Sequence, residues 1–250
     1  MNCKIMVKYH YQQKLTSQSE KEVYIFFRND SIFKLGWSYF ILMFILEAIL
    51  PEWFGDENGI IENLQLLWLI GGMFYCIKAH SYKYADWGGS SKAFWKAGAI
   101  YFFLLIMREI SWGRVFFTNP DGGMIQYSQM GLYGKLVHPM VGILILSMLI
   151  LLYKAHIWQM LKIVKIPIKS FSLLLLFIFF SWVGERTNFT GFHGQVAEEL
   201  AEFGAYMMMY VLLKDADSIL RLFANEAKSV TSHELNYPTD ENRISKFQDL

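Results

Sequence analysis

Glutamates gather in an apolar part of this sequence, where a membrane or a protein core would exclude charge. The stretch QVAEELAEFGAYMMMY, residues 195–210, carries Glu198, Glu199 and Glu202 among Ala, Met, Tyr and Val. At about 100° per residue, these three side chains and Tyr206 fall within one arc of roughly 100° on a helix. Such carboxylates can transfer protons or bind a cation. The sequence therefore predicts a polar helix face with acid–base or cation-binding chemistry.

A second dense stretch, MREISWGRVFF at residues 107–117, supplies arginines. Arg108 and Glu109 end an apolar run, and Arg114 follows after Gly113, which can stop a helix. Arg108 and Arg114 could hold a phosphate or carboxylate headgroup through charge-assisted hydrogen bonds. The alternative is an interface anchor that pairs with the glutamates of residues 198–202.

The stretch GERTNFTGFHGQ, residues 184–195, joins two apolar runs and carries Glu185, Arg186 and His193. His193 changes its charge near neutral pH, so it could act as an acid or a base. The alternative is an ordinary surface-loop histidine. Arg186 is a further candidate for binding a headgroup.

Histidines also raise the question of a metal or a haem. His138 and His193 with two glutamates would make a divalent-metal set, although no tight metal-binding spacing such as HExxH occurs. A haem is disfavoured because His80 and His156 lie among lysines, as surface histidines do. The cofactor stays open between a divalent metal and none.

The elements that must position these residues are apolar runs of membrane length. The chain is 54% hydrophobic, and a helix needs roughly 20 mostly apolar residues to cross a bilayer. Six stretches approach that length, and we expect an all-α polytopic membrane bundle of six transmembrane helices. The stretches are Leu35–Pro51, Ile60–Ile77, Ala93–Trp112, Leu136–Tyr153, Ile166–Gly184 and Gln195–Leu213.

Basic residues orient this bundle. With six spans, nineteen of the 23 Lys and Arg residues lie on the side of the two termini. By the positive-inside rule both termini are cytoplasmic. The expected organisation is a cytoplasmic segment at 1–34, a transmembrane domain at 35–214 and a polar cytoplasmic tail at 215–250, which is expected to be loosely ordered after Arg221.

In this topology the glutamates in and beside the spans, and Arg108, Arg114 and Arg186, fall at outer ends. Seven carboxylates face Arg108, Arg114 and Arg186, and the acids are Glu47, Glu62, Glu109, Glu185, Glu198, Glu199 and Glu202. Glu62 and Gln65 are three residues apart and share a helix face. Because charge is costly against lipid, these groups should line one polar chamber that opens extracytoplasmically. Taken singly, each of these residues can also be explained by a contact with lipid headgroups or by an ion pair between helices.

Two of these segments resemble an uncharacterised prokaryotic multi-pass membrane protein family. Its members carry a segment similar to Glu109-Ile110-Ser111-Trp112-Gly113 and a later Glu-Glu-Leu-x-Glu helix similar to residues 198–202. This chain departs from the pattern at Arg108 and Arg114, where the family has Glu and Gln. The resemblance implies a bacterial cytoplasmic (inner) membrane protein and names no activity.

Two classes of function remain open. The first is a membrane enzyme, a hydrolase or transferase acting on a lipid or lipid-linked substrate, with Glu198, Glu199, Glu202, Glu109 and His193 as catalytic groups. Its substrate would be bound by Arg108, Arg114, Arg186 and Glu62. The rival is a non-catalytic subunit of a protein complex or a cation- or proton-binding transport protein. Membrane lipids are the expected partners. The net charge of +1 does not indicate a nucleic-acid-binding surface.

Overall fold

The computed structural model describes residues 30–55, 59–82, 89–117, 125–164, 168–186 and 194–235, and every regular element among them is helical. The predicted all-α class is confirmed. The long helices are α2 (Asp30–Ile49), α3 (Ile60–His80), α4 (Ser91–Glu109), α5 (Gly131–Lys154), α7 (Ile168–Arg186) and α8 (Gly194–Leu235). The short elements are α6 (Ile157–Val164) and the 3-10 turns η1 (Glu52–Gly55), η2 (Ser111–Phe116) and η3 (Tyr127–Met130).

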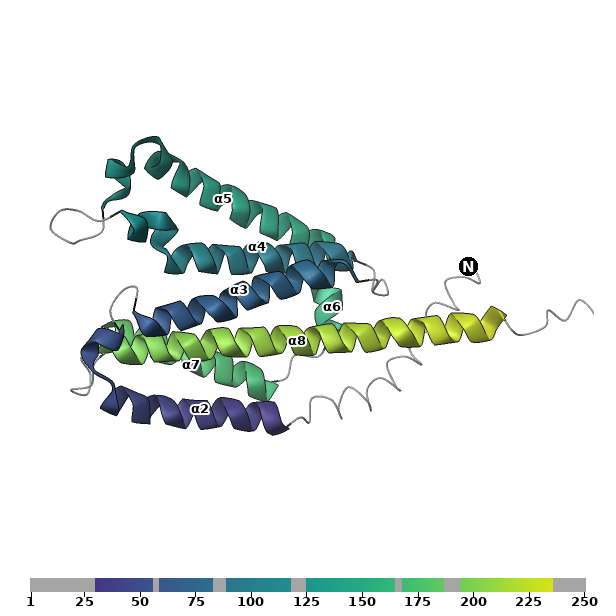
Figure 1. Ribbon diagram of the computed structural model, residues 1–250. Coiled ribbons are helices and arrows are strands. Elements are labelled where there is room, and N and C mark those ends of the chain that lie inside the picture. Colours follow the sequence, from purple (N-terminus) through teal and green to yellow (C-terminus); the bar gives the residue numbers. More distant parts are fainter. Residues whose placement is uncertain are drawn as a thin grey trace, which may run out of the picture.

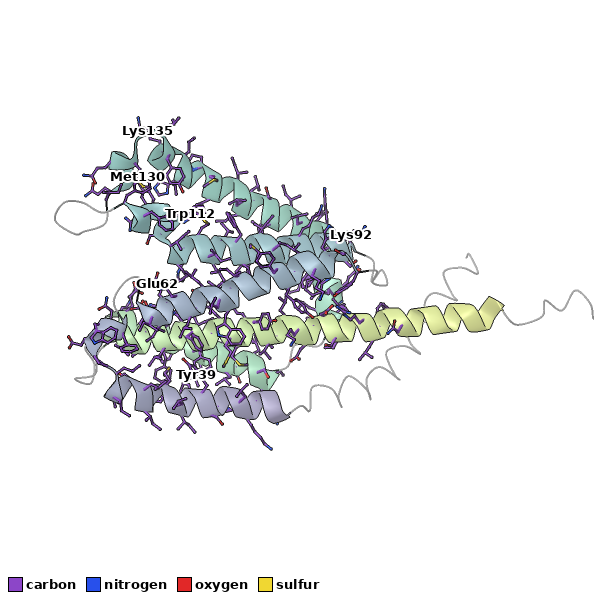
Figure 2. All side chains as sticks on the ribbon, in the orientation of Figure 1. Tyr39, Glu62, Lys92, Trp112, Met130 and Lys135 are labelled. Atoms are coloured by element: carbon purple, nitrogen blue, oxygen red, sulfur yellow. The ribbon has the colours of Figure 1, made fainter. Side chains whose placement is uncertain are left out.

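The long helices run side by side with alternating direction (Figure 1). The last turns of α2, α4 and α7 therefore lie at the same end of the bundle as the first turns of α3, α5 and α8. We call this the acidic end, and the other the lysine-rich end. Figure 2 shows Glu62, Trp112 and Lys135 towards the acidic end and Lys92 at the lysine-rich end.

Three segments among the described residues are long and apolar enough to cross a membrane: Glu52–His80, Tyr127–Lys154 and Ile168–Arg186. Helix α4 carries Lys92, Lys96, Arg108 and Glu109, and α8 carries Glu198, Glu199 and Glu202, which lowers the mean hydropathy of both helices. The chain thus has the helices of an integral membrane protein, and the count of six spans stays a prediction.

Helix α8 is the central element of the bundle, and it contributes to both apolar cores. One core joins Leu69 of α3, Trp95 and Phe102 of α4, and Ile219 of α8. The other joins Met43 of α2, Phe177 of α7, and Val196 and Met208 of α8. By contrast α5 packs chiefly on α4, and only Gly134 and Val137 of this helix are buried. The acidic residues of α8 are therefore positioned by α7, α3 and α2, and they meet the end of α4 through side-chain contacts.

The structure has helices beyond the predicted spans. The segment after Arg221, expected to be loosely ordered, is helical as far as Leu235, because α8 runs over 42 residues from Gly194 to Leu235. The segment between the fourth and fifth predicted spans contains α6. Pro139 lies inside α5, where it removes one backbone hydrogen bond.

Helix α4 stops at Glu109, three residues before the expected end at Trp112. Ser111 and Trp112 adopt left-handed backbone angles (φ 45° and 53°), followed by Gly113 at 84°. Non-glycine residues rarely adopt this conformation, so the surrounding structure must stabilise it. Tyr133 donates a hydrogen bond to the Trp112 carbonyl oxygen at 2.9 Å, which ties this turn to α5.

Candidate functional site

A hydrogen-bonded network at the acidic end links α4, α7 and α8. The Arg108 guanidinium pairs with Glu202, and its Nε lies 3.2 Å from Oε1 of Glu109. Glu109 is buried and accepts a hydrogen bond from the Tyr206 hydroxyl at 2.7 Å. The Ser181 hydroxyl donates to Glu202 at 3.2 Å. One arginine thus holds two carboxylates, each of which also accepts from a hydroxyl group.

Next to this network, Gln65 of α3 contacts Glu199 of α8. Gln65 is 0% exposed, and its Nε2 donates to both the backbone oxygen and Oε2 of Glu199, each at 2.8 Å. Its Oε1 is buried and has no hydrogen-bond partner among the described residues. A buried acceptor without a donor costs free energy, so this atom is suited to receive a donor or a cation.

Negative charge exceeds positive charge here. Glu62, Glu109, Glu199 and Glu202 lie within electrostatic range of one another. Glu198 lies within range of Glu202 and Glu109, and it forms no hydrogen bond or ion pair with a described residue. Around Glu109, Glu198, Glu199 and Glu202, the network described above contributes one arginine, Arg108. Crowded carboxylates repel one another unless a proton or another cation lies between them.

Two other predicted arginines pack on aromatic rings. The Arg114 guanidinium lies over the Tyr127 ring at 4.9 Å, and that of Arg186 lies over the Trp182 ring at 4.8 Å. Arg186 forms no ion pair with any residue in the described ranges. The structure brings Glu62, Arg108, Glu109, Glu198, Glu199 and Glu202 together.

The predicted histidines do not form a metal centre in the described part of the chain. The His138 ring packs against Tyr127 at a centroid distance of 5.5 Å, and His193 lies outside the described residues. Within the described ranges, no group of three His, Cys, Asp or Glu side chains is arranged to hold a metal ion. The metal prediction thus depends on residues beyond these ranges.

Sequence reasoning missed two polar contacts. Ser181 was not singled out, because a lone serine in an apolar run carries no signal. At the lysine-rich end, Asp217 is 2% exposed, accepts from Arg221 at 2.9 Å and pairs with the Tyr75 hydroxyl. The spacing of four residues between Asp217 and Arg221 on one helix was a usable signal. This contact holds the extension of α8 against α3.

No protein-family model, curated protein or solved structure matches this chain. The resemblance seen in the two short segments stays a prediction, and the site is interpreted from its own geometry.

Proposed function

We propose that the chain is a six-span protein of the bacterial cytoplasmic membrane with both termini in the cytoplasm. The charge asymmetry supports this topology, since nineteen of 23 basic residues then lie inside. The acidic end faces outwards in this arrangement, and the lysine-rich end faces the cytoplasm.

Reporter fusions test the topology. We expect fusions after Ile163 and after Leu250 to report the cytoplasm, and a fusion after Gln126 to report the outside. The physical reason is the cost of moving lysine-rich segments across the membrane. A cytoplasmic reporter at Gln126 would contradict the proposal, because the acidic end would then face inwards.

For the site itself we propose binding and release of a small monovalent cation, a proton or Na⁺. The observation that carries this proposal is Gln65, whose amide nitrogen is bonded to Glu199 while its buried Oε1 has no donor in the described residues. An amide oxygen beside carboxylates is a typical ligand for a hard cation and equally an acceptor for a protonated carboxyl. The excess of acids around Arg108 adds the electrostatic attraction.

The lipid-directed enzyme is the second candidate, and Ser181 favours it. Its hydroxyl donates to Glu202 at 3.2 Å, a geometry in which Glu202 could take the hydroxyl proton as a general base. The headgroup site that such an enzyme needs has less support, because Arg114 and Arg186 pack on aromatic rings. Cation binding therefore fits the geometry better.

Thermal unfolding of the detergent-purified full chain tests the cation proposal. If the ligand is Na⁺, we expect Tm to rise when NaCl replaces choline chloride at constant pH. If the ligand is a proton, we expect Tm to rise only when the pH falls. A ligand at 100 times its Kd stabilises the folded state by about 2.7 kcal/mol. Glu199→Gln removes one repelling charge, so its Tm should equal or exceed that of wild type while the response is lost. Gln65→Leu should also lose the response.

Matched variants separate this result from general charge effects. Glu52→Gln neutralises an exposed acid at the same end of the bundle and should keep the response. Ser181→Ala should keep the response too. If this variant binds the cation normally but fails to complement a deletion strain, the result would favour the enzyme. A wild-type Tm that changes with neither Na⁺ nor pH would overturn the proposal, as would a Glu199→Gln variant that melts early and still responds.

A further inference from the structure

Helix α6 is an amphipathic helix at the lysine-rich end, and no part of the proposed cation site uses it. Four apolar residues at the spacing of one helix face pack on the bundle: Met160 and Val164 are buried, and Ile157 and Leu161 lie against the same core. This core includes Ile219 and Leu220 of α8, so α6 is attached to the central helix. In Figure 1, α6 is a short segment near the ends of α3 and α4.

The opposite face of α6 and its two flanks expose aromatic and apolar side chains. Trp158 is 78% exposed, Tyr153 at the end of α5 is 84% exposed, and Ile168 at the start of α7 is 81% exposed. An eight-residue helix is too short to cross a bilayer. A helix with such a face typically lies in the membrane interface, where Trp and Tyr are enriched.

Lysines accompany these side chains, and no acid in the same part of the sequence offsets them. Lys154 and Lys162 are exposed, and no Asp or Glu occurs between Asp121 and Glu185. The nearby acid Asp217 of α8 is buried and already bonded to Arg221 and Tyr75. The surface around α6 is therefore positive and aromatic.

The corner that presents α6 is closely packed. The backbone nitrogen of Ser90 donates to the carbonyl oxygen of Lys154 at 3.2 Å, and a Cβ added to Gly89 would lie 2.2 Å from the Ala155 carbonyl oxygen. His156 adopts φ 49°, which turns the chain from α5 into α6. The segment before α4 thus holds the α5–α6 corner in place and orients Lys154 and Trp158 together.

We infer that the surface formed by Tyr153, Lys154, Trp158 and Lys162 binds the headgroups of anionic phospholipids. Charge complementarity selects this occupant: the lysines attract the phosphate and the net negative charge, and the exposed rings enter the boundary between headgroups and acyl chains. A zwitterionic lipid offers the same apolar contact without the net charge. The surface therefore discriminates by headgroup charge, independently of the cation site.

The test titrates short-chain phosphatidylglycerol into the detergent-purified full chain and follows Tm, with short-chain phosphatidylcholine as the comparison lipid. We expect stabilisation by phosphatidylglycerol at concentrations where phosphatidylcholine has little effect. The double variant Lys154→Gln, Lys162→Gln should bind phosphatidylglycerol roughly 30-fold more weakly, the combined factor expected for two lysines near an anionic surface.

The matched control removes two exposed lysines of α2 and α7, Lys34→Gln and Lys169→Gln. The Lys169 ammonium lies over the Phe33 ring of α2, 5.8 Å from its centroid, so this pair is apart from α6. The affinity of the control for phosphatidylglycerol should stay within about threefold of wild type. Circular dichroism verifies that both double variants fold. Equal losses in the two double variants would overturn the inference, because the lipid would then respond to total charge. Equal binding of phosphatidylcholine, or of glycerol phosphate without acyl chains, would overturn it as well.

Discussion

Arg108→Gln is expected to destabilise the folded chain by about 1–3 kcal/mol, the cost of leaving buried polar groups without their partner. The Arg108 side chain is itself 56% exposed, but it contacts Glu109 and Glu202, whose side chains are only 5% and 12% exposed. Without the guanidinium, these carboxylates stay desolvated and repel each other and Glu199. Equilibrium unfolding in detergent measures the change in the free energy of unfolding.

Two further variants make the Arg108 result specific. Lys135→Gln removes one positive charge from an exposed residue at the acidic end, and we expect a change within about 0.5 kcal/mol. Adding Glu202→Gln to Arg108→Gln removes one of the uncompensated acids, so the double variant should be more stable than the single Arg108 variant. If Arg108→Gln unfolded like wild type, the ion pairs would contribute nothing measurable and the acids would be stabilised in another way.

Gly184→Ala is the second large effect, with an expected loss of about 1–3 kcal/mol. A Cβ at Gly184 would lie 2.9 Å from the backbone nitrogen of Glu198 and 3.0 Å from its Cα. Backbone atoms cannot rotate away as a side chain does, so α7 must move off α8. That movement separates Ser181 from Glu202, which are now 3.2 Å apart. Thermal unfolding measures the loss of stability.

Gly142→Ala is the matched control for Gly184→Ala. Gly142 also lies within a helix, and a Cβ built there has no atom within 4 Å. Alanine should therefore leave the free energy of unfolding unchanged or raise it by about 0.5–1 kcal/mol, because alanine loses less backbone entropy than glycine in a helix. Equal losses at both positions would mean that the close approach of α7 and α8 is not what Gly184 provides.

The sequence by itself determined the helical class, the approximate helix positions and the end of the bundle where charge gathers. Long apolar runs require helices that satisfy their own backbone hydrogen bonds, and this requirement is independent of which helices become neighbours. The polar face of residues 198–206 was predictable for the same reason: side-chain direction along one helix follows from its period alone.

Only the tertiary structure decided which polar and charged side chains contact one another. Arg108 could have paired with any of several glutamates, and its pairing with Glu202 depends on how the end of α4 lies against α8. The same holds for Gln65 with Glu199, and for Arg114, which packs on Tyr127. The left-handed turn at Ser111 and Trp112 was equally unpredictable from the local sequence, because Tyr133, 21 residues after Trp112, helps to stabilise it. Such contacts join residues far apart in the chain, and a local pattern carries no information about which of them meet.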